Sequence, residues 1–390
     1  MTVAVEARDL WKTYPGDIHA VKGINFRIEP GELMVLVGAS GCGKTTTLRM
    51  VAGLERVSEG QILVGDRVVN DIHPAKRGVA LVFQNFALYP HKTTFKNIAF
   101  PLESAGVPRD EIRRRVTEVA EMLELGDHLH KTPDGLSGGQ QQRVSLGRAI
   151  VRNPSVLLLD EPLSNLDARL RVVMRSELKR IQRKVGSTAL YVTHDQVEAM
   201  TMGDRIVVMS GGNIAQIGTP QDVFLMPADM AVARTIGSPA MNLLTGTATA
   251  GVAGALLQGQ DWALNLTGEA AVALARQMSG SGQSVALGIR PEDLAIGPLD
   301  TTPEPLAIGP CITAEPLGSE TLYNIDIAGS LVRALLRETH VSFPEGSKTA
   351  LSLKPGARIH VFDTATENRL VSAVCDPDSV WRVPTGSEPM

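Results

Sequence analysis

Short apolar runs alternate with stretches of helical periodicity along the first part of the chain. Leu33–Val37 and Val156–Leu159 contain no polar side chain, which is typical of strands buried on both faces of a parallel sheet. Residues 109–131 carry apolar positions at helical spacing, and residues 168–185 are also expected to form a helix. This alternation predicts an α/β fold in which helices cover a parallel sheet.

Shorter runs near both ends of this region predict antiparallel pairs. Residues 3–9 and 20–28 would form a small antiparallel sheet, joined through an aromatic turn at residues 11–16. Gly211-Gly212-Asn213 is typical of a tight turn between two strands. We therefore expect a hairpin at the end of the α/β region.

The pattern changes from about Gly237, where glycine, threonine and short strands replace long helices. Many short strands separated by turns predict a small β-barrel of the OB type. We expect an α/β domain over residues 1–235, with a helical subdomain at about 87–155, and an all-β domain over residues 236–376. Residues 377–390 should form a flexible tail. The strands expected in the second domain are 243–248, 284–289, 322–327 and 358–362.

Length and composition fit two domains with separate cores. The 390 residues carry a formal net charge of -4, with a pI near 6.1, which gives no support to a nucleic-acid partner. No apolar run approaches the roughly 20 residues of a membrane span, and the N-terminus lacks the pattern of a signal peptide. The three cysteines show no C-x-x-C spacing, which disfavours metal and disulfide sites. We therefore expect a cytosolic chain.

A phosphate-binding motif follows the first buried strand. Residues 38–45 read GASGCGKT, an instance of G-x-x-x-x-G-K-[ST] between a strand and a predicted helix. In such a loop, backbone N–H groups surround the phosphates, the lysine contacts the β and γ phosphates, and the last hydroxyl binds Mg²⁺. Cys42 is either a tolerated small residue or a thiol whose modification blocks the site. The expected nucleotide-binding residues are Gly38, Ala39, Ser40, Gly41, Cys42, Gly43, Lys44, Thr45 and Thr46.

Two further segments suit a bound nucleotide. One is a predicted helix start, where unpaired N–H groups favour a phosphate and glycine permits close approach. The other is the strand Val156–Leu159, which ends in Asp160 and Glu161, at the edge where open α/β sheets bind ligands. Taken alone, the two acids are more typical of an exposed turn, but the phosphate loop favours a site. The helix start contains Ser137, Gly138, Gly139 and Gln140.

These segments, in this order, resemble the ATP-binding-cassette (ABC) ATPases, and the resemblance covers roughly residues 10–215. Gln84 is similar to the family's Q-loop glutamine, Ser164 to Asp167 to its D-loop, and His194 to its switch histidine. In the family an aromatic residue near the N-terminus stacks on adenine, which suits Tyr14. The resemblance therefore implies ATP as the cofactor, together with Mg²⁺.

The resemblance also implies residue roles. Thr45, Gln84 and Asp160 would hold Mg²⁺. Glu161 would orient or deprotonate the attacking water, and His194 would contact the γ-phosphate, so the catalytic residues are Glu161, His194 and Gln84. Such an ATPase would couple hydrolysis to solute import.

Partners follow from the same resemblance. Two cassettes, expected to be a homodimer, would pair head to tail, so that Ser137 to Gln140 and Asp167 of one chain close on ATP held by the other. The aromatic-rich loop Phe86–His91 would dock on two transmembrane permease subunits, served indirectly by an extracytoplasmic solute-binding protein. The chain would therefore lie at the cytoplasmic face of the cell (inner) membrane as a peripheral subunit.

The second domain narrows the expected subfamily. Residues 237–244 and 288–293 resemble the C-terminal regulatory domain of carbohydrate-type importers, in particular the maltose and sn-glycerol-3-phosphate ATP-binding subunits. The solute would then be a di- or oligosaccharide or glycerol-3-phosphate. Two alternatives stay open: a soluble ABC ATPase without a transport role, and a nucleotide-binding module without turnover. One phosphate loop, no sustained heptads, and the intact Glu161 and His194 disfavour both.

Overall fold

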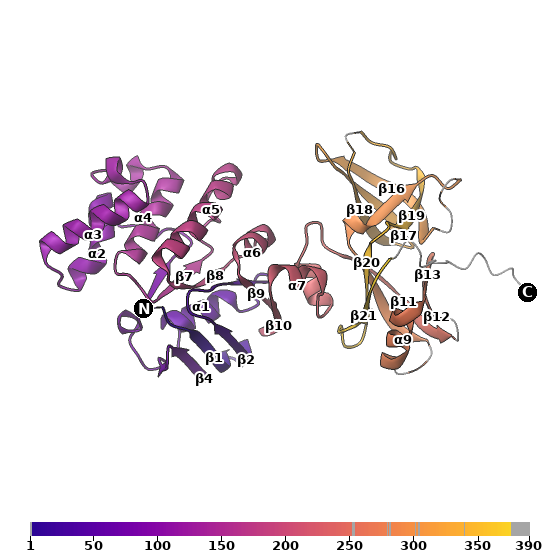
Figure 1. Ribbon diagram of the computed structural model, residues 1–390, viewed down its shortest axis with the longest axis horizontal. Coiled ribbons are helices and arrows are strands. Elements are labelled where there is room, and N and C mark those ends of the chain that lie inside the picture. Colours follow the sequence, from indigo (N-terminus) through magenta and orange to yellow (C-terminus); the bar gives the residue numbers. More distant parts are fainter. Residues whose placement is uncertain are drawn as a thin grey trace, which may run out of the picture. The chain divides into compact units, whose positions relative to one another are not determined.

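The structure, a computed structural model, describes residues 2–251, 254–278, 280, 282–300, 302, 305–338 and 340–375. The chain divides into two compact units between Gln221 and Asp222, and each unit is considered by itself (Figure 1). The flexible tail predicted at residues 377–390 lies outside the described residues.

The first unit contains two sheets. Their strands are β1 (Val5–Tyr14), β2 (Ile18–Ile28), β3 (Leu33–Val37), β4 (Glu59–Val64), β5 (Arg67–Val68), β6 (Val79–Val82), β7 (Val156–Asp160), β8 (Thr188–Val192), β9 (Arg205–Ser210) and β10 (Asn213–Gly218). The larger sheet has the order β10-β9-β3-β8-β7-β6 and is parallel except for its edge strand β10. The smaller, antiparallel sheet has the order β2-β1-β4-β5. Residues of both sheets bury their apolar side chains in one core, as the apolar runs predicted.

Helices cover the parallel sheet. They are α1 (Lys44–Ala52), α2 (Thr94–Ser104), α3 (Arg109–Met122), α4 (Gly138–Ile150), α5 (Ala168–Val185) and α6 (Gln196–Met202), with 3-10 turns η1 (Pro74–Lys76), η2 (Gly126–His128) and η3 (Pro133–Gly135). Figure 1 shows α2, α3 and α4 grouped together beside the sheet. No helix in the described part of the chain is long and apolar enough to span a membrane.

Two local predictions were wrong. The helix expected over residues 109–131 ends at Met122, because Glu124 adopts a left-handed backbone with φ of 55° that interrupts helical geometry. The aromatic turn expected at residues 11–16 is shorter, since β1 continues to Tyr14.

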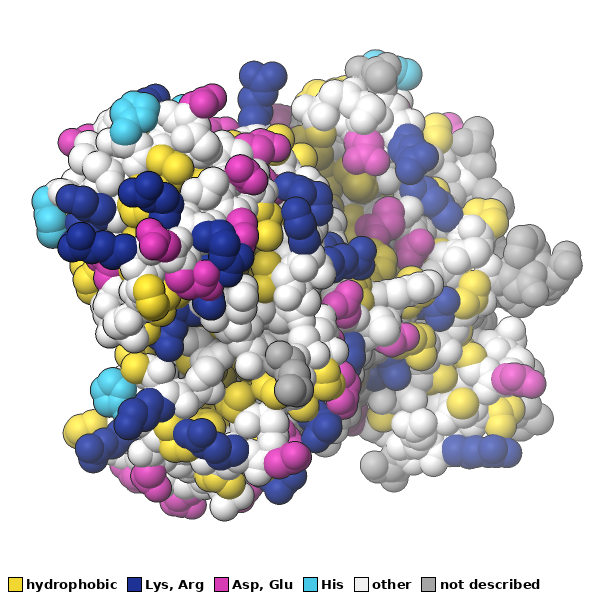
Figure 2. All heavy atoms as spheres, turned by 60° about the vertical axis from the view of Figure 1, so that its left-hand side comes forward, with side chains coloured by type: hydrophobic (Ala, Val, Ile, Leu, Met, Phe, Trp, Pro, Cys, Tyr) yellow, Lys and Arg dark blue, Asp and Glu magenta, His cyan; other side chains and the backbone are white. Residues whose placement is uncertain are grey.

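The charged face of α3 carries paired ions, with Arg114 lying 2.7 Å from both Glu111 and Glu118. Figure 2 shows similar mixing of basic and acidic side chains over the surface turned forward.

The second unit is built mainly from antiparallel strands. They are β11 (Asn242–Gly251), β12 (Gly254–Gly259), β13 (Trp262–Leu266), β14 (Gln283–Ile289), β15 (Leu294–Gly297), β16 (Ala307–Pro316), β17 (Thr321–Ile327), β18 (Ser330–Leu336), β19 (Lys348–Leu353), β20 (Arg358–Asp363) and β21 (Arg369–Val374). The four strands expected from the sequence are confirmed as parts of β11, β14, β17 and β20. Their inward side chains form a separate core.

Short helices accompany these strands. They are α7 (Pro220–Leu225), α8 (Met230–Thr235), α9 (Gly268–Gln277) and the 3-10 turn η4 (Pro291–Asp293). The pattern of short strands did not anticipate α9, which buries Ala271 and Leu274 against the core. The sequence 268–277 does carry apolar residues at helical spacing, so the signal was present but short.

Candidate functional site

A cavity of about 330 Å³ lies where the phosphate loop meets the carboxyl ends of the parallel strands β7 and β8. Open α/β sheets bind ligands at this edge. The cavity brings together the phosphate loop, Glu161 and His194, whereas Tyr14 is not among its described lining residues. The lining consists of Ala20, Ser40, Gly41, Gly43, Lys44, Thr45, Thr46, Glu161 and His194.

The loop closes through approaches that only glycine permits. A Cβ atom at Gly38 would lie 2.3 Å from the carbonyl oxygen of Met209, and one at Gly43 would lie 2.5 Å from that of Ala20. Such distances are far below ordinary contact, so any side chain would displace the loop. The two glycines of the motif therefore hold the loop against β9 and β2.

Lys44 is buried inside this loop, with 6% of its surface exposed. Its Nζ donates to the carbonyl oxygens of Gly38 at 2.8 Å and Ala39 at 2.9 Å, and lies 3.7 Å from Cys42 Sγ. Each of these partners is uncharged. Among the described residues none forms an ion pair with Lys44, and such a buried cation favours the binding of an anion beside it.

Helix α1 begins within the loop, so its first N–H groups have no acceptor in the helix. The first helical hydrogen bond runs from the Thr47 N–H to the Gly43 carbonyl at 2.9 Å. Among the described hydrogen bonds, none is donated by the backbone N–H of Lys44, Thr45 or Thr46, and all three residues line the cavity. These donors and the positive end of the helix form an anion site.

Oxygen ligands for a cation lie beside these donors. The Thr45 hydroxyl donates to Asp160 Oδ1 at 3.2 Å. Burial raises the pKa of Asp160 above its ordinary value, although the hydrogen bond from Thr45 opposes this. A divalent cation would offset that burial cost. One hydroxyl and one carboxylate beside a phosphate site fit Mg²⁺, which is commonly held by one or two carboxylates and substrate phosphates.

Glu161 joins three of the segments predicted from the sequence. Its Oε2 accepts a hydrogen bond from Gln84 Nε2 at 3.2 Å and lies 3.1 Å from His194 Nδ1. Its backbone has φ of 44°, and its N–H donates to the Val192 carbonyl at 3.0 Å. A left-handed residue that is not glycine is strained, and such strain gathers at functional sites. The described hydrogen bonds leave Glu161 Oε1 without a protein donor.

Residues after Glu161 fix this arrangement, and sequence reasoning assigned no individual role to Ser164 and Asn165. Asn165 Nδ2 donates to the Gln84 carbonyl at 2.9 Å, and Ser164 Oγ donates to the Glu161 carbonyl at 2.9 Å. Asp167 caps α5, because its Oδ1 accepts from the Leu170 N–H at 3.0 Å. The signal was a Ser-Asn pair two residues beyond the acids, since both side chains readily bond to nearby backbone.

The predicted phosphate-binding helix start is the start of α4. Ser137 and Gln140 form a capping box, in which each side chain bonds to the other's backbone N–H, at 3.4 Å and 2.9 Å. The described bonds leave the N–H groups of Gly138 and Gly139 for a ligand. A Cβ at Gly139 would lie 3.0 Å from the Leu170 side chain, so packing also favours a small residue there. No described hydrogen bond joins this segment to the phosphate loop.

Tyr14 lies beside a small charged group. Its hydroxyl donates to Glu55 Oε2 at 3.3 Å, and Lys12 Nζ lies 4.7 Å from the centre of its ring. Lys12 also pairs with Glu55 at 2.7 Å. A cation over one ring face leaves the opposite face for stacking on a base. The adenine contact of Tyr14 stays a prediction.

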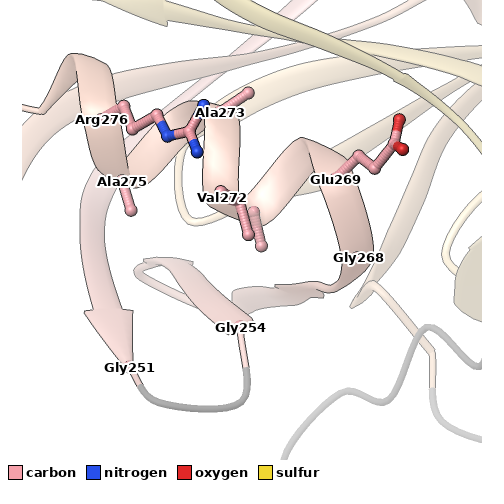
Figure 3. Close-up of a pocket in the computed structure, with 9 residues that line it drawn as sticks. Gly251, Gly254, Gly268, Glu269, Val272, Ala273, Ala275 and Arg276 are labelled. Carbon is pink, nitrogen blue, oxygen red and sulfur yellow. The ribbon is translucent and has the colours of Figure 1, made fainter.

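A larger cavity, of about 890 Å³, lies in the second unit along α9 (Figure 3). Val272 points toward the β11–β12 hairpin, while Glu269 points away from it. The lining is otherwise mostly glycine and alanine, and Arg276 is its only basic residue among those described. None of the residues predicted from the sequence lies there, so cavity size alone does not locate the site.

The fold and the smaller cavity define a phosphate-loop ATPase of the cassette type. The ABC transporter family matches residues 21–164, and the MalK OB fold domain matches residues 237–294. The sn-glycerol-3-phosphate import ATP-binding protein UgpC of Rhodopseudomonas palustris is 52% identical over 295 residues, covering 75% of each chain. The trehalose/maltose import ATP-binding protein MalK of Thermococcus litoralis is 46% identical, covering 92% of this chain and 97% of that one. This chain belongs to the ATP-binding subunits of ABC importers.

Solved structures agree with this assignment over the first unit. The dimeric ATP-binding cassette MJ0796, bound to ADP and Pi, has a TM-score of 0.50 and 32% identity, and covers 55% of this chain and 98% of that one. CbiO1 of Clostridium perfringens, part of an ABC transporter complex, has a TM-score of 0.53 and 28% identity, covering 58% and 92%. The predicted fold class, a cassette followed by an OB domain, and the predicted ATPase activity are confirmed.

Proposed function

We propose that hydrolysis takes place in the 330 Å³ cavity and powers the import of sn-glycerol-3-phosphate or of a di- or oligosaccharide. The observation that carries the proposal is the junction at Glu161. One carboxylate oxygen holds both Gln84 and His194 within 3.2 Å, beside a helix start with unpaired N–H groups. Such a site has a proton acceptor, a proton donor and an anion cradle together.

The residues present fit ATP with Mg²⁺. The N–H groups of the loop and Lys44 would hold the phosphates, and Thr45 and Asp160, with Gln84, would hold the cation. When bound, Mg²⁺ neutralises charge on the β and γ phosphates. Lys44 would then exchange its two carbonyl partners, Gly38 and Ala39, for phosphate oxygens.

Glu161 would accept the proton of the attacking water through its open oxygen. Because His194 contacts Glu161 in this state, we propose that it moves to the γ-phosphate when nucleotide binds. Ser137 to Gln140 would contribute Gly138 and Gly139 N–H donors to the nucleotide of a second copy, since no described hydrogen bond joins them to the phosphate loop of their own chain. The working unit would be a dimer of cassettes, as in the solved MJ0796 dimer.

The segment after Gln84 would transmit closure to membrane partners. Arg148 of α4 donates to the carbonyl oxygens of Ala87 at 2.6 Å and Phe86 at 2.9 Å. Tyr89 packs on Phe100 of α2, with ring centres 4.7 Å apart. The loop therefore connects the site to the helices α2 and α4. We propose that it docks on two permease subunits at the cytoplasmic face of the membrane, fed by an extracytoplasmic binding protein.

The solute is proposed from the relatives, whose names state sn-glycerol-3-phosphate or trehalose/maltose import. The test is the ATPase rate of this chain reconstituted with its co-purifying membrane subunits and binding protein. Glycerol-3-phosphate and oligosaccharides would be added separately, with Glu161→Gln chains as the blank. Stimulation by one class names the solute. Hydrolysis without stimulation by either would refute both solutes, and failure to co-purify with membrane subunits would favour a soluble ATPase.

A further inference from the structure

The position of His194 depends on its backbone. Its side chain is 60% exposed and lies within ion-pair distance of Glu161 alone among the described residues. A ring with more than half of its surface exposed is little constrained by packing, so its position depends on the backbone that carries it. Those residues, Thr193 and Asp195, form an internal network that the catalytic roles proposed above do not use.

The centre of this network is the buried carboxylate of Glu198, which is 3% exposed. Glu198 Oε2 accepts hydrogen bonds from the Tyr191 hydroxyl at 2.8 Å and the Thr193 hydroxyl at 2.7 Å. Tyr191 and Thr193 lie two residues apart at the end of β8, so their side chains share one face. Burial raises the pKa of Tyr191 well above its ordinary value, and its hydroxyl stays a donor.

Thr193 extends the network past His194. Its hydroxyl oxygen also accepts a hydrogen bond from the Asp195 N–H at 2.9 Å. Asp195 in turn caps α6, since its Oδ1 accepts from the N–H groups of Val197 at 2.7 Å and Glu198 at 3.2 Å. The residues on both sides of His194 are thereby tied to α6. The Thr193 N–H also donates to the Leu36 carbonyl at 3.1 Å, which fixes the same point to β3.

We propose that Thr193, oriented by Glu198, is a positioning residue that sets where the His194 ring stands relative to Glu161. The inference rests on the role of His194 in hydrolysis proposed above. A buried carboxylate with two donors also stabilises the fold, and that structural role alone would leave turnover per folded molecule unchanged. The two accounts therefore differ in kcat.

The chain offers a matched pair of threonines, one at the start of β8 and one directly after its end. Thr188, at the other end of β8, is also buried, and its hydroxyl donates to the Val3 carbonyl at 2.6 Å. Thr193→Val should lower the kcat for ATP hydrolysis roughly 10-fold with KM changed less than about 2-fold, because misplacement slows the chemical step rather than binding. Thr188→Val should weaken the fold with kcat unchanged. Thr193→Ser, which keeps the hydroxyl, should restore kcat.

A double-mutant cycle with His194→Ala completes the test. If Thr193 acts through His194, then Thr193→Val should cost nothing further in the His194→Ala chain. A full additional loss in the double variant, or normal kcat in Thr193→Val, would overturn the inference. Normal kcat in His194→Ala would instead overturn the proposed role of the histidine. Tyr191→Phe removes a donor to the same carboxylate and serves the same cycle if Thr193→Val does not fold.

Discussion

Both units contain buried polar groups, but among the described residues the site of the first unit has polar groups that face a cavity without a protein partner. Around α1 and Glu161, backbone donors and a carboxylate oxygen face a cavity. In the second unit, Arg290 is 4% exposed, yet it donates to the carbonyl oxygens of Phe224 at 2.6 Å and Ile236 at 2.8 Å. Burial of a polar group therefore indicates ligand binding only where its partners are missing.

Arg290 and its partners form a closed cluster, in which the polar groups bond to one another and serve the fold. The Arg290 guanidinium lies 3.6 Å from the centre of the Phe224 ring, and a Cβ at Gly237 would come within 2.2 Å of its Nη1. Gly237 and Arg290 belong to the two segments that resembled the regulatory domain. The close approach of these two residues is therefore a contact between the two segments. Its hydrogen bonds tie Phe224 and Ile236 to Arg290, which directly follows β14 in the same unit.

The largest expected effect tests the open site. Glu161→Gln should reduce kcat roughly 10²- to 10⁴-fold, the range for loss of a general base, because the amide cannot accept the proton of water. ATP affinity should be retained, since the loop donors are untouched. The measurements are phosphate release and equilibrium binding of ATP by the purified chain. Unchanged turnover would remove Glu161 from its proposed role, whereas loss of ATP binding would show that it holds nucleotide instead.

Breaking the closed cluster around Arg290 should lower the stability of the fold. Arg290→Met would remove the donor to the carbonyl oxygens of Phe224 and Ile236, at a cost of about 3 kcal/mol in the free energy of unfolding. The readout is urea unfolding followed by Trp262, which is buried in this unit, in a chain with Trp11 and Trp381 replaced by Phe. Arg337→Met is the control, because that side chain is 92% exposed. A loss of ATPase kcat with an unchanged free energy of unfolding would contradict the structural role.

Much of the fold was predictable because burial on both faces leaves an unmistakable apolar pattern. The helix α5 has the bounds expected from the sequence, and the apolar runs 33–37 and 156–159 lie in β3 and β7. Prediction was weaker where one residue decides an element's end. Nothing in the apolar spacing of residues 109–131 indicates that Glu124 turns left-handed, and α9 was short enough to be lost among strands.

The site was predictable to the extent that a motif has fixed spacing. The positions of residues 38–45 and of Asp160 at the end of its strand could be predicted from the sequence pattern alone. Contacts between segments were not predictable from spacing, because the bonds from Asn165 to Gln84 and from Glu198 to Thr193 depend on tertiary structure. At the helix start of Ser137 the prediction was incomplete. Its glycines were expected to contact a ligand, and Gly139 also packs closely against Leu170.

The smallest expected effect is a pH dependence confined to the second unit. His360 is 1% exposed, and its Nδ1 lies 2.7 Å from Ser372 Oγ. Burial, with the nearby Arg369, Arg290 and Arg358, lowers the pKa of His360 from 6.5 to about 3. The unfolded chain therefore binds a proton below about pH 6.5 that the folded chain excludes, and stability falls as the pH falls toward 3.

Replacement of His360 by Gln should remove this dependence, because the amide does not titrate. Between pH 7 and pH 5 the wild-type chain should lose about 2 kcal/mol more in unfolding free energy than the His360→Gln chain, since each pH unit below the unfolded pKa contributes about 1.4 kcal/mol. Above pH 7 both chains hold a neutral group at this position, so their slopes should agree there. Equal slopes of unfolding free energy against pH in the two chains below pH 6 would mean that His360 already binds a proton in the folded state. The surroundings of His360 would then be open to solvent, like the site of the first unit.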